Sequence, residues 1–236
     1  MKVVPFVHEG LGNSSYLVAL PNGEAALFDP DRTIARYVAA AEANGWRIAH
    51  IFETHLHADF VSGARELAET IGAALWAASE ARLRFPYQGL VPGQAVQAGG
   101  VEVSAVGSPG HTPEHLAFTL RSQSGPPMLF SGGSLMVGGA ARTDLIAPDK
   151  TELLTRLQFR TLHQAFEALP DETLLYPTHG GGSFCSVGSG SDRTSTLGLE
   201  RRSNPVLDIQ DEDEFARWFP STFPAAPEYF FRMRGV

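Results

Sequence analysis

The sequence predicts an α/β (α+β) protein of the αββα type, in which two β-sheets pack face to face and helices cover their outer sides. Short runs of β-branched and aromatic residues occur in two sets along the chain, and each set is accompanied by segments with helical spacing of apolar residues. Hydrophobic residues make up 43% of the chain, which is enough for a sizeable core, and no motif repeats at a fixed period.

The first set of elements lies between residues 3 and 77. Strands are predicted at residues 3–7, 16–20, 25–28, 48–52 and 74–77. The turn residues at 21–23 predict that the first three strands form an antiparallel meander. Helices are predicted at residues 31–45 and 62–71. Ser62 is the expected N-cap of the second helix, and Gly45 and Gly72 are the expected stops.

The second set begins near residue 101. Strands are predicted at residues 101–106, 116–120, 128–130 and 173–176. A longer helix is predicted over residues 152–169, because Leu153, Leu157 and Leu162 belong to an apolar stripe with helical spacing. Thr151 is its expected N-cap.

The composition changes after residue 198. An acidic stretch at residues 208–214 is followed by seven aromatic residues in a short segment, and a short helix is predicted over residues 211–218. A separate domain of this size is too small to be stable alone. We therefore expect a main domain over residues 1–198 and a C-terminal strap, residues 199–236, that packs on it.

The charge and cysteine content exclude several functions. The formal net charge is -8 and no basic run is present, so nucleic acid is not an expected partner. No segment has the length and apolarity of a membrane span or a signal peptide. The single cysteine, Cys185, excludes an internal disulfide framework and fits a reducing compartment. A cytoplasmic protein is the expectation.

Histidines follow three of the predicted strands. His55, His57 and Asp59 lie at alternate positions directly after one strand, and an extended backbone points such side chains to one side. His111 and His179 lie in Gly/Pro-bearing loops after two further strands. Imidazole and carboxylate are ligands for zinc and iron, so these loops predict a metal site.

These motifs resemble those of the metallo-β-lactamase superfamily. Residues 53–63 are similar to its His-x-His-x-Asp motif, and residues 109–112 and 177–180 are similar to its later histidine motifs. The resemblance extends over about residues 10–190 and implies a sandwich of two mixed β-sheets flanked by helices. It implies that His55, His57, Asp59, His111 and His179 are metal ligands.

The chain is most similar to the persulfide dioxygenase and glyoxalase II branch. The segments at residues 53–63 and 141–144 carry this likeness, and residues 179–185, 195–198 and 201–205 resemble members fused to rhodanese domains. In those proteins a segment like residues 227–233 leads toward the rhodanese module, and this chain stops there. A rhodanese partner on another chain and a homodimer are left open by the sequence.

Two positions depart from the family pattern. Phe60 stands where glyoxalase II-like sites have a histidine, and Gly133 stands where the family has an aspartate that bridges two metals or completes an iron site. A first metal keeps His55, His57 and His111, whereas a second keeps only Asp59 and His179. We therefore expect one divalent metal, Fe(II) or Zn(II).

Three further residues near the predicted site have alternative interpretations. Arg142 is a candidate handle for an anionic group such as a glutathione carboxylate, with Asp144 beside it in the substrate site. The alternative for Arg142 is an ion pair with Asp144.

Cys185 is interpreted as a small buried residue, although contact with a sulfur substrate is the alternative. The Gly- and Ser-rich residues 180–195 predict a long loop, either substrate-binding or a plain surface loop.

Three functions follow from these observations. The first is a mononuclear persulfide dioxygenase that acts on glutathione persulfide or a related thiol and forms sulfite and free thiol, as the resemblance implies. The second is a zinc-dependent thioester hydrolase of glyoxalase II type, in which Asp59 orients or deprotonates a metal-bound water. The third is a non-catalytic member that binds a thiol ligand or a partner protein and has lost turnover with the change to Gly133.

Overall fold

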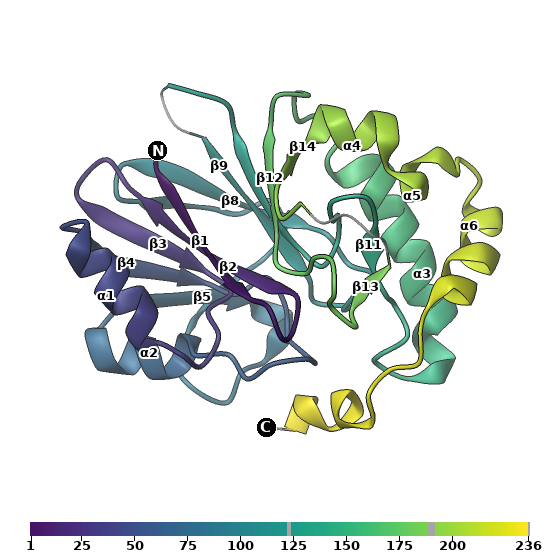
Figure 1. Cartoon of the computed structure of the whole chain (residues 1–236), viewed down its shortest axis with the longest axis horizontal. Helices are drawn as coiled ribbons and strands as arrows, with labels where there is room; N and C mark the ends of the chain where they lie inside the picture. Colours follow the sequence, from purple (N-terminus) through teal and green to yellow (C-terminus); the bar gives the residue numbers. More distant parts are fainter. Residues whose placement is uncertain (122–123, 188–191, 236) are drawn as a thin grey trace.

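The computed structural model of the protein describes residues 1–121, 124–187 and 192–235 and has an αββα sandwich architecture (Figure 1). The first sheet has the strand order β1-β2-β3-β4-β5-β6, and the second has the order β14-β12-β10-β9-β8-β7. Each sheet contains parallel and antiparallel neighbours, so both are mixed. The predicted fold class is confirmed.

The elements of the first sheet and its helices are β1 (Val3–His8), β2 (Asn13–Ala19), β3 (Glu24–Phe28), α1 (Ala35–Ala43), β4 (Arg47–Phe52), α2 (Ala64–Ile71), β5 (Ala74–Ala78) and β6 (Gln88–Leu90). The second sheet consists of β7 (Ala95–Ala98), β8 (Val101–Gly107), β9 (Leu116–Arg121), β10 (Met128–Gly132), β12 (Leu174–Pro177) and β14 (Ser195–Thr196). The remaining regular elements are β11 (Ala140–Ala141), β13 (Ser186–Val187), α3 (Thr151–Arg160), α4 (Leu197–Ser203), α5 (Pro205–Asp208) and α6 (Glu212–Trp218).

Aromatic side chains fill the space between the two sheets. The rings of Phe28 on β3 and Phe130 on β10 stack with their centroids 3.8 Å apart. Phe52 and Phe118 extend the same buried cluster from β4 and β9. Burying rings of this size between two sheets is a large part of the hydrophobic stabilisation of such a core. This cluster holds the two sheets at a fixed distance, and with them the loops at their ends.

Helices cover the outer faces of both sheets. Helices α1 and α2 pack on the first sheet through a cluster that includes Tyr37, Leu67 and Ile51. Helices α3 and α6 pack on the second sheet through a cluster that includes Phe159, Leu175 and Phe215 (Figure 1). None of the helices in the described ranges has both the length and the apolarity to cross a membrane.

The predicted long helix over residues 152–169 needs correction. The α-helix begins at Thr151 and ends at Arg160, and a π-helical turn at Thr161–Ala165 follows. The Thr151 side chain does not cap this helix, because a 3-10 turn at Pro148–Lys150 already brings Thr151 into helical geometry. The prediction of Ser62 as the N-cap of α2 is also wrong, because Gly63 occupies that position, although the Ser62 hydroxyl accepts a hydrogen bond from the Ala64 N–H at the start of the helix.

Several short elements were not predicted from the sequence. Strands β6, β7, β11, β13 and β14 and helices α4 and α5 each have seven residues or fewer. Segments of this length contain too few residues to show a period. Of the predicted loop at 180–195, residues 188–191 lie outside the described ranges.

The chain after residue 198 contacts the main sandwich at two places. Phe215 and Phe219 are fully buried in the cluster that lies on the second sheet. Further along, Phe230 is 1% exposed and packs with Ala58, Leu145 and Cys185. The C-terminal segment therefore reaches from the α3 side of the molecule to the loop that follows β4.

We expect Phe215→Ala to lower the free energy of unfolding by about 3–5 kcal/mol, because it leaves a cavity under α6. Urea unfolding of the whole chain measures this change. Leu199→Ala, at a position on α4 that is 48% exposed, is the control and should change it by less than about 0.5 kcal/mol. A main transition that is unaffected by Phe215→Ala would show that the strap unfolds separately.

Candidate metal centre

The five predicted metal ligands are all buried and lie on loops that follow strands of both sheets. His55, His57 and Asp59 follow β4, His111 lies between β8 and β9, and His179 follows β12. The most exposed of the five is His57, at 8%. Because β4 belongs to the first sheet and β12 to the second, the cluster forms only where the two sheets meet.

Three of the imidazoles converge. The ligand atoms of His55, His111 and His179 all lie within 4.8 Å of one another. The Nε2 atoms of His55 and His179 are 3.2 Å apart. A metal ion bound between them would have three neutral nitrogen ligands, which is the ligand set of many catalytic zinc sites.

The other ring nitrogen of each of these histidines faces an oxygen acceptor. His111 Nδ1 lies 2.6 Å from the Arg142 carbonyl oxygen, and His179 Nδ1 lies 3.1 Å from Asn13 Oδ1. His55 Nδ1 lies 2.8 Å from Thr54 Oγ1, whose own proton is donated to Asp29. Each Nδ1 therefore carries the proton in the neutral ring, and each Nε2 keeps a free lone pair for a metal.

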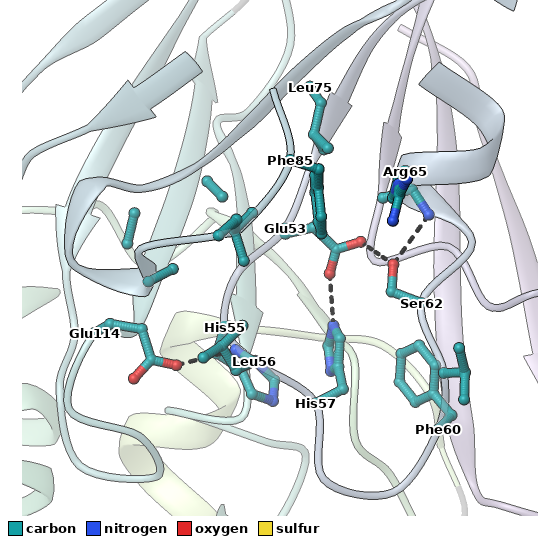
Figure 2. A pocket seen from close by; sticks show the side chains of 16 residues that line it. Glu53, His55, Leu56, His57, Phe60, Ser62, Arg65, Leu75, Phe85 and Glu114 are labelled. Carbon is teal, nitrogen blue, oxygen red and sulfur yellow. Dashed lines mark hydrogen bonds and ion pairs between the residues drawn. The ribbon is translucent and has the colours of Figure 1, made fainter. Parts of the chain in front are cut away.

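A second group shares His179 with the first. It consists of His57, Asp59 and His179. Asn13 Nδ2 donates a 2.6 Å hydrogen bond to Asp59 Oδ2, and this bond also orients the Asn13 amide toward His179. His57 turns toward Glu53, with its Nε2 3.0 Å from Glu53 Oε2 (Figure 2).

The buried atoms of the site fit a metal ion. His57 Nδ1, Asp59 Oδ1 and His111 Nε2 are buried without a hydrogen-bond partner among the described residues. Buried polar atoms nearly always have partners, so unpaired atoms in one cluster need an explanation. Lone pairs directed at a bound cation supply it.

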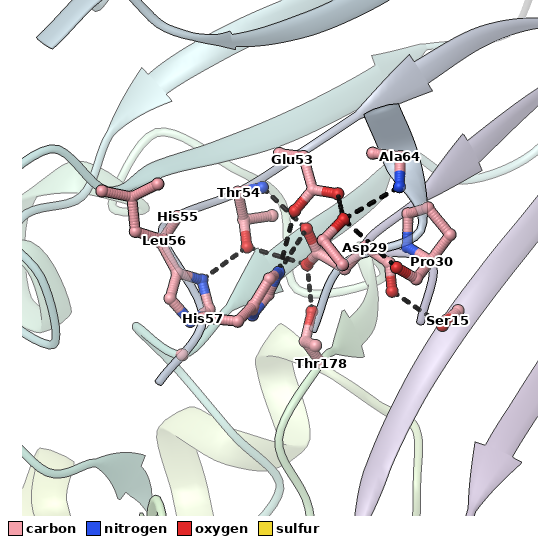
Figure 3. A network of polar contacts seen from close by, with 12 residues as sticks. Ser15, Asp29, Pro30, Glu53, Thr54, His55, Leu56, His57, Ala64 and Thr178 are labelled. Atoms are coloured by element: carbon pink, nitrogen blue, oxygen red, sulfur yellow. Dashed lines mark hydrogen bonds and ion pairs between the residues drawn. The ribbon is translucent and has the colours of Figure 1, made fainter. Parts of the chain in front are cut away.

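A network of buried carboxylates lies behind the metal ligands (Figure 3). Asp29 accepts hydrogen bonds from the Thr54 N–H and hydroxyl and from the Thr178 hydroxyl, and its Oδ1 lies 3.4 Å from His57 Nε2. Glu53 accepts a hydrogen bond from Ser62. Asp29 has a φ of 47°, a left-handed conformation that directs its carboxylate into this network.

Three residues of this arrangement were not singled out from the sequence as part of the site: Asn13, Asp29 and Glu53. Asp29 and Glu53 each follow a predicted strand directly, which is the same signal that located the histidines. Asn13 gives no comparable signal, because its role depends on His179, 166 positions away in the sequence.

Burial and neighbouring charges set the protonation of the site. Burial lowers the pKa of His55 and of His111 well below the usual value, so both are neutral. Burial also lowers the pKa of His57, but the Asp29 and Glu53 carboxylates outweigh it and raise this pKa to about 10. Burial raises the pKa of Asp59, but His179 outweighs it and holds this pKa below its usual range. In the metal-free protein His57 is therefore protonated, and it pairs with the Asp29 and Glu53 carboxylates.

Gly133 lies directly against His111. A Cβ atom at residue 133 would be 2.5 Å from His111 Cδ2 and 3.1 Å from the Ala141 Cβ. The Gly133 N–H donates a 3.0 Å hydrogen bond to His115 Nε2, which holds the backbone in place. The imidazole of His111 therefore takes up the space that the start of any side chain at residue 133 would need.

Arg142 and Asp144 form a bidentate ion pair. Arg142 Nε and Nη2 donate hydrogen bonds of 2.7 and 2.8 Å to the two Asp144 oxygens, and the Arg142 side chain is 3% exposed. The ring of Phe223 lies 5.4 Å from the guanidinium carbon. Both features match the ion-pair interpretation of Arg142, and a substrate contact by either residue stays a prediction. Cys185 is fully buried beside Phe230.

Comparison with known proteins identifies relatives of two activities. Residues 8–194 match the sequence profile of the Metallo-beta-lactamase superfamily. The hydroxyacylglutathione hydrolase of Nitrosococcus oceani is 36% identical over 171 residues, which cover 71% of this chain and 62% of that protein. The mitochondrial persulfide dioxygenase of Homo sapiens is 27% identical over 191 residues, which cover 80% of this chain and 69% of that protein.

A solved structure shows the same fold over the whole chain. The crystal structure of a metallo-beta-lactamase from Staphylococcus aureus subsp. aureus COL superposes with a TM-score of 0.91 and 31% sequence identity. The superposition covers 100% of this chain and 71% of that one. This chain thus matches only part of each relative, and 62% of the length of the hydrolase.

The space around Gly133 predicts that no side chain can be added there without a loss of metal binding. We expect Gly133→Ala and Gly133→Asp each to weaken binding of Zn(II) and Fe(II) about tenfold or more, because both displace His111. Competition with a chromophoric chelator measures the affinity. Gly10→Ala, where a Cβ meets no atom closer than 3.6 Å, is the control. Tighter binding by Gly133→Asp would show that a carboxylate can act as a ligand there.

The raised pKa of His57 predicts a pH dependence of the metal-free protein. The folded value of about 10 exceeds the ordinary value of 6.5, so the stabilisation is fully present below pH 6.5 and is lost as the pH rises through 10. We expect the free energy of unfolding to fall over this range, and to fall less in His57→Gln. Chemical unfolding at several pH values measures it, with exposed His8→Gln as the control. Equal pH slopes in wild type and His57→Gln would contradict the assignment.

Proposed function

The chain belongs to the metallo-beta-lactamase superfamily, and we propose that it is a metal-dependent enzyme that binds one divalent ion and acts on a thiol-derived small molecule. Its proposed activity is that of a persulfide dioxygenase. The observation that carries this proposal is the convergence of His55, His111 and His179 at a single point, next to a glycine instead of a carboxylate.

The number of side chains available as ligands favours one bound ion over two. Three candidate groups are present among the described residues, and His179 belongs to two of them, the third being Asp29, His55 and His57. The Nδ1 of His179 is already bound to Asn13. Its remaining nitrogen can coordinate only one ion at a time. A second ion would keep His57 and Asp59 and would have no bridging carboxylate at residue 133. A dinuclear hydrolytic mechanism is therefore disfavoured.

An iron(II) ion held by His55, His111 and His179 would supply open positions for O2 and for the terminal sulfur of a persulfide. Because these three ligands are neutral, they leave the positive charge of a divalent ion uncompensated, and the site favours an anionic sulfur group. The overall reaction consumes one O2 and one water. The terminal sulfur loses four electrons to O2, the sulfur–sulfur bond breaks, and the products are sulfite, the free thiol and two protons.

Asp59 is the residue proposed to handle a proton. Its Oδ2 is held by Asn13, and its Oδ1 is buried without a partner among the described residues. Because its pKa is held below the usual range, the carboxylate is ionised and can accept a hydrogen bond from a thiol, persulfide or water at the site. It would take the proton itself only where a bound metal ion has made that group more acidic. Glu53 and Asp29 keep the His57 ring in one orientation beside it.

A zinc-dependent thioester hydrolase is the second candidate. Three histidines are the ligand set of zinc sites that lower the pKa of a bound water, and a hydroxyacylglutathione hydrolase is 36% identical to this chain. In this case Asp59 would orient the water or take its proton. The thiol carrier, a rhodanese partner, a homodimer and a cytoplasmic location remain predictions.

The metal content decides between these candidates. We expect protein purified anaerobically without a metal-binding tag to contain about one iron per chain, and to consume O2 and release sulfite with glutathione persulfide. One zinc per chain with thioester hydrolysis would favour the second candidate. Protein that binds neither ion after incubation would be a non-catalytic thiol-binding member of the family.

His179→Gln tests the ligand set. We expect it to lose metal binding and activity together, because the ion loses one of three nitrogens. Its matched control is His163→Gln, a half-buried histidine on the π-helical turn at Thr161–Ala165, which should keep both. Full metal occupancy in His179→Gln would show that the ion is held by other residues, with His57 the first to examine.

A further inference from the structure

A cavity of about 300 Å³ lies on one side of the loop that carries His55 and His57 (Figure 2). The other walls come from the start of α2, the end of β5 and the segment at residues 81–85. Strands β4 and β5 are parallel neighbours, so the cavity lies at their carboxyl ends. This edge of a parallel arrangement is where open α/β proteins commonly bind ligands.

The surface of this cavity is mainly apolar. Leu75, Leu83 and Phe85 line it, together with the ring of Phe60, which stacks on His57 at a centroid distance of 4.2 Å. Small residues create the space, since four alanines contribute to the walls. Ala77 is one of these, and its side chain is 3% exposed. A larger residue at this position would fill the cavity.

The charged groups on the walls interact with neighbouring groups of the protein, several of which also line the cavity. Glu53 contacts His57 and Ser62, and Glu114 accepts a hydrogen bond from the Leu56 N–H. Arg65 pairs with Glu69 and lies over the ring of Phe85. What the cavity offers to a ligand is therefore apolar surface, with the two histidines at one side.

The same histidines connect the cavity with the metal centre. His55 lines the cavity, and its Nε2 belongs to the set with His111 and His179. His57 lines the cavity as well and belongs to the set with Asp59 and His179. A molecule in the cavity thus contacts His55, one of the three histidines proposed to hold the ion, and His57 beside it.

We propose that this cavity binds the apolar arm of the substrate, an unbranched alkyl or acyl chain of about six to ten carbon atoms. The sulfur end of the substrate lies at His55 and His57. The inference rests on the proposed function, because it assigns the arm to a persulfide or thioester that reacts at the metal. It specifies a thiol carrier with a hydrocarbon chain.

The test measures binding of unreactive probes that share this chain. Butanamide, hexanamide and octanamide are titrated calorimetrically into metal-free and metal-loaded protein. We expect Kd to fall about fourfold for each added methylene, because each one leaves water for an apolar wall. Ala77→Phe and Ala81→Phe, which fill the cavity from two walls, should each weaken octanamide binding at least tenfold. Ala43→Phe, at an exposed position of α1, is the matched control and should not change it.

Thermal unfolding and metal content show whether each variant is folded. Two variants are used because Ala77 lies in a strand and Ala81 in a turn, so that a folding defect in one leaves the other informative. The inference would be overturned if the affinity for the three amides did not depend on chain length. It would also be overturned if octanamide affinity were unchanged in both folded cavity variants.

Turnover then tests whether the bound chain belongs to the substrate. With persulfides of butanethiol, hexanethiol and octanethiol, we expect KM to fall along the series, and Ala77→Phe to abolish the difference. A KM that does not depend on chain length would overturn the assignment to the substrate. If no persulfide or thioester is turned over, the proposed function fails, whereas octanamide binding to the metal-free protein still decides whether the cavity takes an apolar chain.

Discussion

A single buried carboxylate, that of Asp29, joins the strand ends on which the candidate metal centre depends. It accepts hydrogen bonds from Thr54 at the end of β4 and from Thr178 at the end of β12, so it connects the first sheet with the second. Through Thr54 it sets the proton position on His55, and it also contacts His57 directly. Thr178 is the residue before His179. The Asp29 carboxylate therefore orients the side chains of four residues: Thr54, His55, His57 and Thr178. Asp29 does not itself belong to the converging set of three histidines.

The position of Gly133 and the three neutral ligands have a common physical basis. The His111 ring occupies the volume that a side chain at residue 133 would need, and its Nδ1 is held by the Arg142 carbonyl. The ring is therefore fixed from two sides. A carboxylate at residue 133 and the present position of His111 exclude each other by simple packing. His179, held by Asn13, completes the group of nitrogens, so the charge of a divalent ion bound there would be balanced by its other ligands or by Asp59.

The candidate metal centre and the apolar cavity share one loop, so under the proposed function a substrate in the cavity would lie beside a metal ligand. The residues after β4 place imidazoles toward the centre, while Leu56 and Phe60 of the same loop line the cavity. Phe60 stacks on His57, so the apolar wall also helps to hold a candidate ligand. The C-terminal segment reaches this loop from the other end of the chain, because Phe230 packs on Ala58. Tail, loop and cavity thus form one connected unit around the centre.

The sequence by itself determined the αββα class and most of the longer strands and helices, and it predicted the five candidate ligands. These features depend on short-range patterns: alternation along a strand, helical spacing, and His-x-His-x-Asp spacing directly after an apolar run. The same signals missed the short strands β6 and β7, and they placed the end of the α3 helix too late, because a π-helical turn replaces its last part.

Only the tertiary structure decided how the ligands are grouped and which nitrogens are free. His179 is shared between two groups because β12 brings it to His55, 124 positions away in the sequence, and Asn13 orients its ring. Arg142 is held by Asp144 and lies beside Phe223 of the C-terminal segment. The cavity is lined by residues of the 53–85 stretch together with Glu114 from the loop between β8 and β9. The physical reason is that a side chain's orientation, protonation and free volume are set by its neighbours in space. A pattern along the chain identifies the residue type but not those neighbours.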